Sequence, residues 1–408
     1  MKNRPLVVLF ATLLLDTISI GIIIPVLPAI FTDPTSPTFA LAGYTLGMQY
    51  FLAGAITAVF GLMQFLAAPI LGELSDTYGR KRLLTIGVAV LAFSNLLFGL
   101  GVEIASLALL LVARTLAGLA GANFSIAQAT IADVSKPEDR AKNFGLIGAA
   151  FGIGFILGPL LGGYIASLFG HAAAPFWFAG LLGVFNVAFI ALTLPETRKV
   201  SERTVARFSL LKGFRNISAA FKDRDAAPVY LASFLYMSGF AFFTSFIGIM
   251  LSVVHGYSEA SIGSFFAVVG VCIAVTQLVI LPQVVRRFPE KRILLFGFPI
   301  VAAVIALYPF VQGNFWIFLL VPIMAIPQGL AFANISSLVS KSVSADKQGA
   351  ALGINGSLMA LAQGLIPLAA GLGTGIIGLK APFIAGAAFI MTGWFALWRS
   401  HRRVHGSR

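Results

Sequence analysis

Two oppositely charged residues stand alone within long apolar segments of the sequence. Asp16 lies in the run from 6 to 30, and Arg114 lies in the run from 105 to 132. A buried carboxyl group can bind and release a proton, whereas a guanidinium remains charged. A charge in an apolar segment is costly, so each residue should face the protein interior with a partner. We interpret them as an electrostatically coupled pair in which proton binding at Asp16 alternates with substrate binding; a static ion pair that fixes packing is the alternative.

The helices that carry these charges should place them at a similar depth. At a rise of 1.5 Å per residue, each charge lies about 15 Å from the end of its segment, near the middle of a hydrocarbon core about 30 Å thick. Helical spacing puts Arg114, Gly118, Gly121, Ser125 and Gln128 on one small or polar stripe, as expected of a face lining a cavity. Gln49, Gln64 and Asn123 are weaker cavity candidates, because each can instead form a hydrogen bond between helices.

The composition identifies the class of protein. Of 408 residues, 58% are hydrophobic and only 11% are charged, which predicts an integral membrane protein. The formal net charge of +13 does not indicate nucleic-acid binding, because the cations lie in the short connections between apolar segments. We therefore expect the lipid bilayer, and no nucleic acid, as a partner.

Apolar segments of membrane-spanning length occur twelve times. They cover residues 6–30, 45–70, 82–101, 105–132, 141–169, 174–194, 226–253, 259–285, 292–312, 315–340, 348–378 and 381–398. If both termini are cytoplasmic, all Lys and Arg residues except Lys380 and Arg114 fall on the cytoplasmic side. This asymmetry follows the positive-inside rule and predicts twelve helices with both ends inside.

A polar segment divides the predicted spans six and six. It covers residues 195–225 and holds eight basic residues, which favours a cytoplasmic linker beside anionic lipid head groups. The flanking ranges, 1–194 and 226–408, are then two six-helix bundles. Such a repeat predicts a pseudo-twofold axis along the membrane normal, with a substrate site near the midplane.

A short charged segment, G-E-L-S-D-T-Y-G-R-K-R at 72–82, joins the second and third spans. We expect a tight hairpin here, because Gly72 and Gly79 let the backbone turn sharply. Asp76 can accept hydrogen bonds from the free amides at the amino end of a neighbouring helix. Asp76 and Arg80 are therefore candidates for a conformational latch, with topology enforcement as the alternative.

Several segments resemble the major facilitator superfamily, and the 72–82 segment resembles its signature loop. R-T-L-A-G-L-A-G-A from Arg114 is similar to the second motif, and the fifth span resembles the antiporter motif of drug exporters. L-D-T-I-S-I-G-I-I-I-P-V-L-P in the first span, I-A-D-V-S-K-P-E-D-R-A-K-N-F-G after the fourth and L-P-E-T after the sixth resemble the tetracycline/proton antiporters.

This resemblance implies roles for particular residues. It implies that Asp76 meets the eleventh helix near Gln348 and that Arg80 pairs with Asp133. It also implies export, through an antiporter motif whose residues here are Gly148, Gly152, Gly158, Pro159 and Gly162. From their spacing, Gly154, Gly158 and Gly162 should let another helix, such as the eighth, approach closely.

The second half of the sequence has no charged residue well inside its spans. The resemblance implies a histidine in the eighth span and an acidic residue in the ninth, but Ile273 and Val301 stand near those places, which argues against a metal-chelated tetracycline. The remaining cavity candidates are aromatic or carry amides, and they are Tyr236, Phe240, Gln277, Asn334 and Asn355. An aromatic wall with a few amides suits an amphipathic or lipophilic compound.

Together these observations predict an all-α membrane protein with the major facilitator fold that exports drug-like molecules, possibly tetracyclines, in exchange for protons. We expect no enzyme activity, no cofactor and no metal site; the proton gradient supplies the energy, and the protein acts as a monomer in a bacterial inner membrane. A sugar or osmolyte transporter of the same fold, or a receptor or scaffold that transports nothing, are the alternatives.

Overall fold

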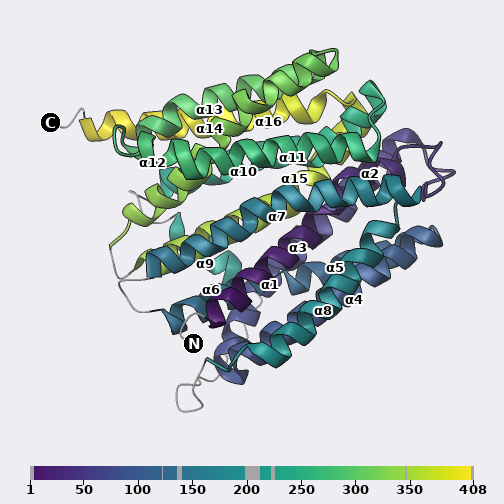
Figure 1. Cartoon of the computed structure of the whole chain (residues 1–408). Helices are drawn as coiled ribbons and strands as arrows, with labels where there is room; N and C mark the ends of the chain where they lie inside the picture. The colour runs from purple at the N-terminus through teal and green to yellow at the C-terminus, as the bar shows by residue number, and fades with distance from the viewer. Residues whose placement is uncertain are drawn as a thin grey trace. The chain divides into compact units, whose positions relative to one another are not determined.

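The computed structural model describes residues 4–121, 123–135, 140–197, 212–221, 226–344 and 347–405, and within these ranges the regular structure is helical (Figure 1). The helices of the first half are α1 (Arg4–Gly21), α2 (Ile23–Phe31), α3 (Leu46–Tyr78), α4 (Arg80–Glu103), α5 (Leu107–Ala120), α6 (Asn123–Val134), α7 (Arg140–Phe169) and α8 (Ala174–Thr193). The short helix α9 (Lys212–Ala220) follows.

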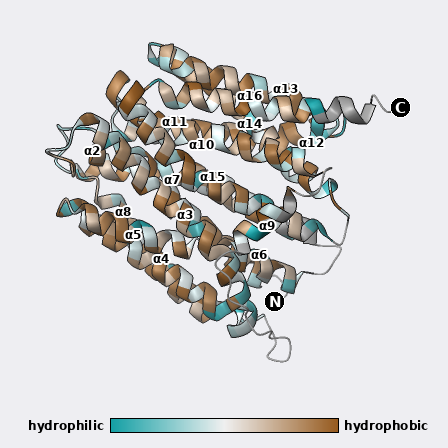
Figure 2. Cartoon of the chain, turned by 180° about the vertical axis from the view of Figure 1, so that it is seen from behind, coloured by the Kyte–Doolittle hydropathy of each residue, from teal (hydrophilic) through white to brown (hydrophobic). Residues whose placement is uncertain are grey.

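The second half begins with α10 (Ala227–His255) and continues with α11 (Glu259–Val275), the π-helical segment η3 (Thr276–Ile280), α12 (Leu281–Val284) and α13 (Glu290–Leu307). The 3-10 turn η4 (Tyr308–Phe310), α14 (Asn314–Lys341), α15 (Gln348–Ile377) and α16 (Ala381–His405) complete it. Hydrophobic residues line most of the length of the long helices (Figure 2).

Twelve membrane-length helical segments occur among the described residues, in agreement with the twelve predicted spans. Most of the predicted span ends lie within two residues of the ends of the helical segments. The second span differs most, because helix α3 continues through the polar residues Glu73 and Asp76 to Tyr78. The predicted hairpin at 72–82 is therefore helical except at Gly79, whose φ of 100° only glycine adopts readily. Gly72 lies inside α3, where it makes no turn.

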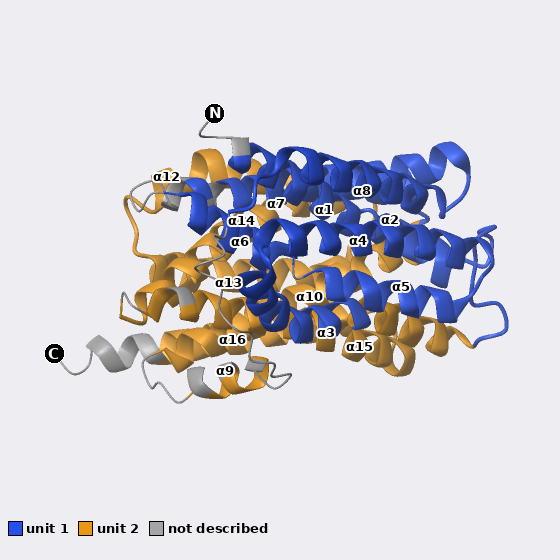
Figure 3. Cartoon of the chain, turned by 90° about the horizontal axis from the view of Figure 1, so that it is seen from below, with its two compact units in different colours: residues 1–44, 59–211, 256–267 blue, residues 45–58, 212–255, 268–408 orange. Residues whose placement is uncertain are grey.

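The chain divides into two compact units (Figure 3). Unit 1 comprises Met1–Tyr44, Val59–Leu211 and Gly256–Ala267, and unit 2 comprises Thr45–Ala58, Lys212–His255 and Val268–Arg408. The division cuts through α3 because its first turns pack tightly on α15. A Cβ at Gly54 would lie 2.2 Å from the Pro367 carbonyl oxygen. The predicted division into bundles 1–194 and 226–408 stays a prediction.

The interior of unit 1 is built largely from aliphatic side chains. Leu9 on α1, Val88 on α4 and Ile126 on α6 belong to one buried cluster. Helix α1 packs on α7 and α8, and α4 packs on α5 and α8. Burial of this apolar surface between helices holds α1, α4 and α6 together, and α1 and α6 carry the buried Asp16 and its hydrogen-bond partner described next.

Candidate functional site

Asp16 lies near the middle of the first span, on α1, and is 8% exposed. Its carboxylate oxygen Oδ2 accepts a hydrogen bond of 3.1 Å from the amide nitrogen Nδ2 of Asn123, the first residue of α6. Asn123 is itself 2% exposed. Among the described residues, the buried carboxylate of Asp16 is therefore hydrogen-bonded to a neutral donor, the side-chain amide of Asn123.

Arg114 lies on α5 in the same unit and is 9% exposed. Its guanidinium carbon is 5.2 Å from the centre of the Phe60 ring and 5.7 Å from that of Phe98, so the cation rests on two aromatic faces. Among the described residues its Nε has no hydrogen-bond partner, and no ion pair within 4.0 Å joins it to Asp16. The electrostatic coupling of the two residues stays a prediction, and it does not take the form of a direct ion pair here.

The fourth predicted span is two helices, α5 and α6, rather than one. Helix α5 ends at Ala120, and Gln64 of α3 donates a hydrogen bond of 3.2 Å to the carbonyl oxygen of Gly121. The break interrupts the predicted polar stripe. Gly118 packs against the backbone of Phe60, whereas Ser125 and Gln128 are half-buried on α6. The small residues on α5 thus serve packing against α3, and the cavity role of Ser125 and Gln128 stays a prediction.

Arg80, at the start of α4, forms a polar cluster in unit 1. Its guanidinium pairs with Asp76 at 2.5 Å and with Asp133 at 3.0 Å, and it donates to the hydroxyl of Ser75 at 2.5 Å. The Arg80 side chain is 6% exposed. The pair of Arg80 with Asp133, which the resemblance implies, is therefore present. The proposed latch between Asp76 and the amino end of α15 stays a prediction.

Glu196 completes this cluster, and sequence reasoning missed its role. Its carboxylate oxygen Oε1 accepts hydrogen bonds from the backbone amides of Arg80, at 2.9 Å, and Thr197, at 3.0 Å. A carboxylate at a helix amino end satisfies a free amide and interacts favourably with the helix dipole. The L-P-E-T segment carried the signal, but no sequence spacing connects residue 196 with residue 80.

The glycines of α7 divide between two partners within unit 1. A Cβ at Gly158 would lie 2.8 Å from the Ile18 carbonyl oxygen, and one at Gly162 would lie 2.4 Å from that of Ile22. This face therefore packs on α1 and α2 rather than on the eighth span. The eighth span meets α7 along another line, where a Cβ at Gly263 would lie 2.6 Å from the carbonyl oxygen of Pro159. Among the described residues, a Cβ at Gly148 or Gly152 would have no heavy atom of another helix within 4 Å.

The cavity candidates of unit 2 take part in neutral hydrogen bonds. Tyr236 on α10 donates its hydroxyl to the amide oxygen of Gln328 on α14, and its ring stacks on Phe298 of α13, 4.2 Å between centres. Ser233 donates to the amide oxygen of Asn355 on α15 at 2.6 Å. All five side chains are buried. Gln328 is thus the partner of a predicted cavity residue.

The other predicted residues of unit 2 have separate contacts. Gln277, in the π-helical segment η3, donates to the Gly329 carbonyl oxygen at 2.9 Å, and Asn334 donates to the carbonyl oxygen of Leu330 at 2.7 Å. Phe240 stacks on Phe243 with ring centres 5.9 Å apart. These contacts are compatible with packing as well as with a cavity, so the cavity role of the three residues stays a prediction.

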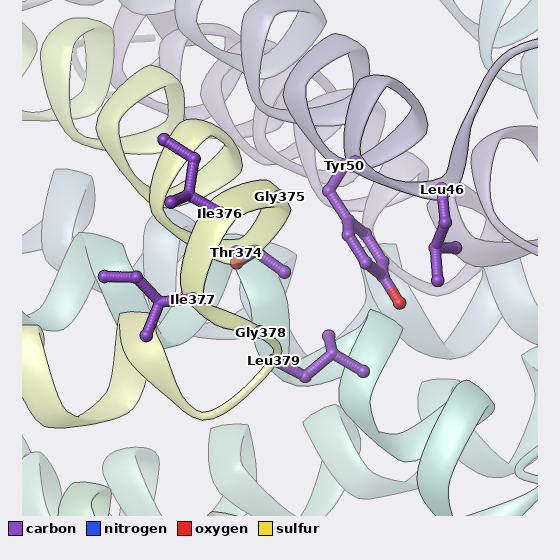
Figure 4. Close-up of a pocket in the computed structure, with 9 residues that line it drawn as sticks. Leu46, Tyr50, Thr374, Gly375, Ile376, Ile377, Gly378 and Leu379 are labelled. Atoms are coloured by element: carbon purple, nitrogen blue, oxygen red, sulfur yellow. The ribbon is translucent and has the colours of Figure 1, made fainter.

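A cavity of about 450 Å³ lies in unit 2, between the first turn of α3 and the last turn of α15. Figure 4 shows the Tyr50 ring pointing into it, close to Leu46 and Leu379. Its lining includes none of the predicted cavity residues, although buried Gln49 directly precedes Tyr50.

An ion pair in unit 2 occupies a place like that of Arg80 in unit 1. Glu290, at the start of α13, pairs with Lys341 at the end of α14 and accepts a hydrogen bond of 2.9 Å from Ser337. Arg80 at the start of α4 and Asp133 near the end of α6 show the same arrangement with opposite charges. Sequence reasoning missed this pair, because the motif that marks the first half is absent around Glu290.

Comparisons with known proteins agree with this architecture. The profile of the Major Facilitator Superfamily matches residues 9–365 and 229–408. Tetracycline resistance protein, class C, of Escherichia coli is 30% identical over 375 residues, which cover 88% of this chain and 86% of that protein. Multidrug resistance protein 1 of Bacillus subtilis (strain 168) is 27% identical over 377 residues, covering 91% and 90%.

Solved structures show the same fold. The crystal structure of the human organic anion transporter MFSD10 (TETRAN) has a TM-score of 0.72 at 24% identity and covers 97% of this chain and 99% of that chain. A bacterial homolog of the human lysosomal transporter Spinster has a TM-score of 0.75 at 17% identity, with coverage of 98% and 97%. With twelve candidate spans among its described residues and the match to the family profile, the chain belongs to the major facilitator superfamily: it is a multi-pass membrane transporter with bacterial homologues, not an enzyme, and it uses no cofactor.

Proposed function

We propose that this transporter exports amphipathic, drug-like small molecules in exchange for protons by alternating access. The observation that carries the proposal is Asp16, a carboxyl group 8% exposed near the middle of a membrane-spanning segment. Such a group destabilises a membrane-spanning segment, so its presence there indicates a functional role. It can bind a proton within the membrane, which is the step that couples transport to a proton gradient.

The site around Asp16 supports proton binding over a static ion pair. Asp16 accepts a hydrogen bond from neutral Asn123, whereas the cation of Arg114 rests on Phe60 and Phe98. A carboxylate that is not neutralised by a direct contact can exchange its proton at a smaller cost than one locked in an ion pair. Arg114 then acts through its field, and a change in its distance from Asp16 alters the proton affinity.

The substrate class follows from unit 2. Tyr236, Gln328 and Asn355 offer aromatic surface and neutral hydrogen-bonding groups. The interiors of the spans in this half carry no charged residue. Such a surface favours amphipathic compounds over a metal chelate held by carboxylates. The names of two relatives, which are proteins of tetracycline and multidrug resistance, support a drug-like substrate. Tetracycline itself belongs in the test as one compound among several.

The orientation and cellular location are also part of the proposal. We place both termini in the cytoplasm and the protein, as a monomer, in a bacterial inner membrane. The distribution of Lys and Arg among the connections supports this orientation, because only Lys380 and Arg114 depart from it. The linker 195–225 then lies in the cytoplasm; its residues 198–211 and 222–225 are outside the described residues.

Survival of drug-sensitive bacteria that express the protein tests the proposal. The wild type, Asp16→Asn and Asp33→Asn are compared over a panel that includes tetracycline, ethidium and several lipophilic cations. Asp33→Asn is the matched control, because it removes the same charge from the connection between α2 and α3. We expect protection by the wild type and the control, and loss of protection by Asp16→Asn at equal membrane abundance.

Two outcomes contradict the proposal. Equal protection by the wild type and Asp16→Asn removes the coupling role of Asp16. A wild type that protects against no compound and extrudes none from everted vesicles removes drug export, and uptake assays with sugars and osmolytes then test the metabolite alternative.

A further inference from the structure

We propose that Asn123 is a positioning residue for proton exchange: it holds the Asp16 carboxylate in place and sets the pH at which that group titrates. This inference rests on the proposed function only in giving the titration a role in transport. Asp16 and Asn123 are both at least nine-tenths buried, and the 3.1 Å hydrogen bond between them joins α1 to α6. Asn123 supplies the hydrogen bond described for the Asp16 carboxylate, so it decides how well the ionised form is stabilised.

The fold places Asn123 with little freedom. It is the first residue of α6, directly after the break that separates this helix from α5. Its amide packs on Gly87 of α4 so closely that a Cβ at position 87 would lie 1.8 Å from Oδ1 and 2.9 Å from Cγ. A side chain at position 87 would displace the Asn123 amide, so Gly87 allows Asn123 to reach Asp16.

The amide oxygen of Asn123 provides a second reason to assign this residue a role in proton exchange. Oδ1 is buried and has no hydrogen-bond partner among the described residues. An unpaired buried acceptor calls for an explanation, and the protonated form of Asp16 supplies one. A carboxylic acid donates a hydrogen bond, so rotation of the amide by half a turn lets Oδ1 accept from it. Asn123 can therefore serve both protonation states, donating to the carboxylate and accepting from the acid.

The other charged groups near α1 leave this role to Asn123. The side chains of Arg80 and Asp133, on α4 and α6, pair with each other at the ends of their helices. Arg114 on α5 rests on aromatic rings without an ion pair to Asp16. Helices α2 and α8 contain no ionisable residue. The remaining charged residues on α4 and α7 lie at helix ends, and they are Lys81, Arg82, Glu103, Arg140 and Lys142.

The test is a direct titration of Asp16, which needs no substrate. Infrared difference spectra of the purified protein in lipid vesicles, recorded against pH, report the carbonyl band of protonated carboxyl groups, and Asp16→Asn identifies the band of Asp16. Asn123→Leu keeps the size of the side chain and removes its donor. The substitution also removes the acceptor, but the hydrogen bond to the ionised carboxylate is charge-assisted and stronger than the one that the acid would donate. We therefore expect the midpoint of the Asp16 band to move to higher pH by about one unit.

Two further variants separate this role from a general effect on packing. Gly87→Ala leaves Asp16 and Asn123 themselves unchanged, and the three heavy atoms nearest to the added methyl group all belong to Asn123, so it should displace Asn123 and move the midpoint in the same direction. It also keeps the test open if Asn123→Leu does not fold. Asn186→Leu is the matched control, because Asn186 is buried on α8 and bonds to Thr12, one turn before Asp16 on α1. Its midpoint should equal that of the wild type.

The outcomes for this inference and for the proposed function are distinct. An unchanged midpoint in Asn123→Leu and Gly87→Ala overturns the role of Asn123, even if Asp16→Asn abolishes transport. An equal shift in Asn186→Leu overturns it as well, because the effect is then one of packing. A wild type whose Asp16 band does not titrate has the same consequence. A shifted midpoint together with full transport by Asp16→Asn supports the role of Asn123 and contradicts proton coupling.

Discussion

Units 1 and 2 differ in the charge of the polar groups that are buried at mid-span. In unit 1 the buried groups at mid-span are charged and separate, with Asp16 bonded to a neutral amide and Arg114 set on aromatic rings. In unit 2 the pairs of Tyr236 with Gln328 and of Ser233 with Asn355 are buried hydrogen bonds between neutral groups. Charges that lack a direct counter-ion cost stability, whereas satisfied neutral pairs do not. The buried charges of unit 1 therefore reduce its stability, and we attribute their presence to the proposed function.

The same contrast recurs at the helix ends. Arg80 in unit 1 is 6% exposed and contacts two carboxylates, whereas Lys341 in unit 2 is 63% exposed and contacts one. Both pairs join the start of one membrane span to the end of the next. Burial, rather than the presence of an ion pair, should therefore decide how much each contributes to stability.

The largest expected effect is that of Arg80→Met. The substitution leaves Asp76 and Asp133 without their guanidinium, and removal of one partner from a buried ion pair costs about 3–5 kcal/mol. Unfolding of the purified protein in detergent with increasing denaturant measures this loss. A loss below about 1 kcal/mol contradicts the buried character of the cluster.

Gln328→Leu should have the next largest effect. It leaves the buried hydroxyl of Tyr236 without its acceptor, which costs about 1–3 kcal/mol in the free energy of unfolding. Adding Tyr236→Phe removes the unpaired hydroxyl and should restore most of the loss, as measured in a double-mutant cycle. If the double variant is as unstable as Gln328→Leu, the neutral pair does not account for the stability of this region.

Arg114→Met should separate function from stability. We expect transport to fall by at least about tenfold, or about 1.4 kcal/mol in barrier height, with an unchanged or higher melting temperature because a buried charge is removed. Lys380→Met is the matched control, since it removes a cation 4.5 Å from the Phe310 ring in unit 2. Equal transport rates for the two variants would show that Arg114 is not part of the coupling site.

The smallest effect should be that of Lys341→Met. An exposed ion pair contributes about 0–1 kcal/mol, so unfolding of this variant should nearly match that of the wild type. Transport should be unchanged as well. A loss as large as that of Arg80→Met would remove the distinction between the two pairs.

Much of the fold could be predicted from the sequence, because the membrane restricts the choices. Apolar runs of sufficient length and the placement of Lys and Arg indicate twelve spans, and the part of the chain that the structure describes has twelve. The cost of a charge in these runs singles out Asp16 and Arg114 without any knowledge of their neighbours. The pair of Arg80 with Asp133 came from the family resemblance rather than from spacing.

The local geometry of the site could not be predicted in this way. The break before Asn123 occurs within a continuous apolar run, so hydropathy gives no sign of it. Residues 87 and 123 lie on different helices, and their contact depends on packing. The same holds for Glu196, whose carboxylate reaches the amide of Arg80 from 116 residues away. Glycines indicated close packing on α7, but their spacing does not say which helix approaches.

Transport by purified protein in liposomes under an imposed pH gradient tests the central claim most directly. The compound is one against which the wild type protects cells, and the wild type is compared with Asp16→Asn. We predict that the wild type accumulates the compound against its concentration gradient, releases it when the pH gradient is dissipated, and that Asp16→Asn accumulates none. Uphill accumulation by Asp16→Asn equal to that of the wild type would contradict proton coupling at Asp16.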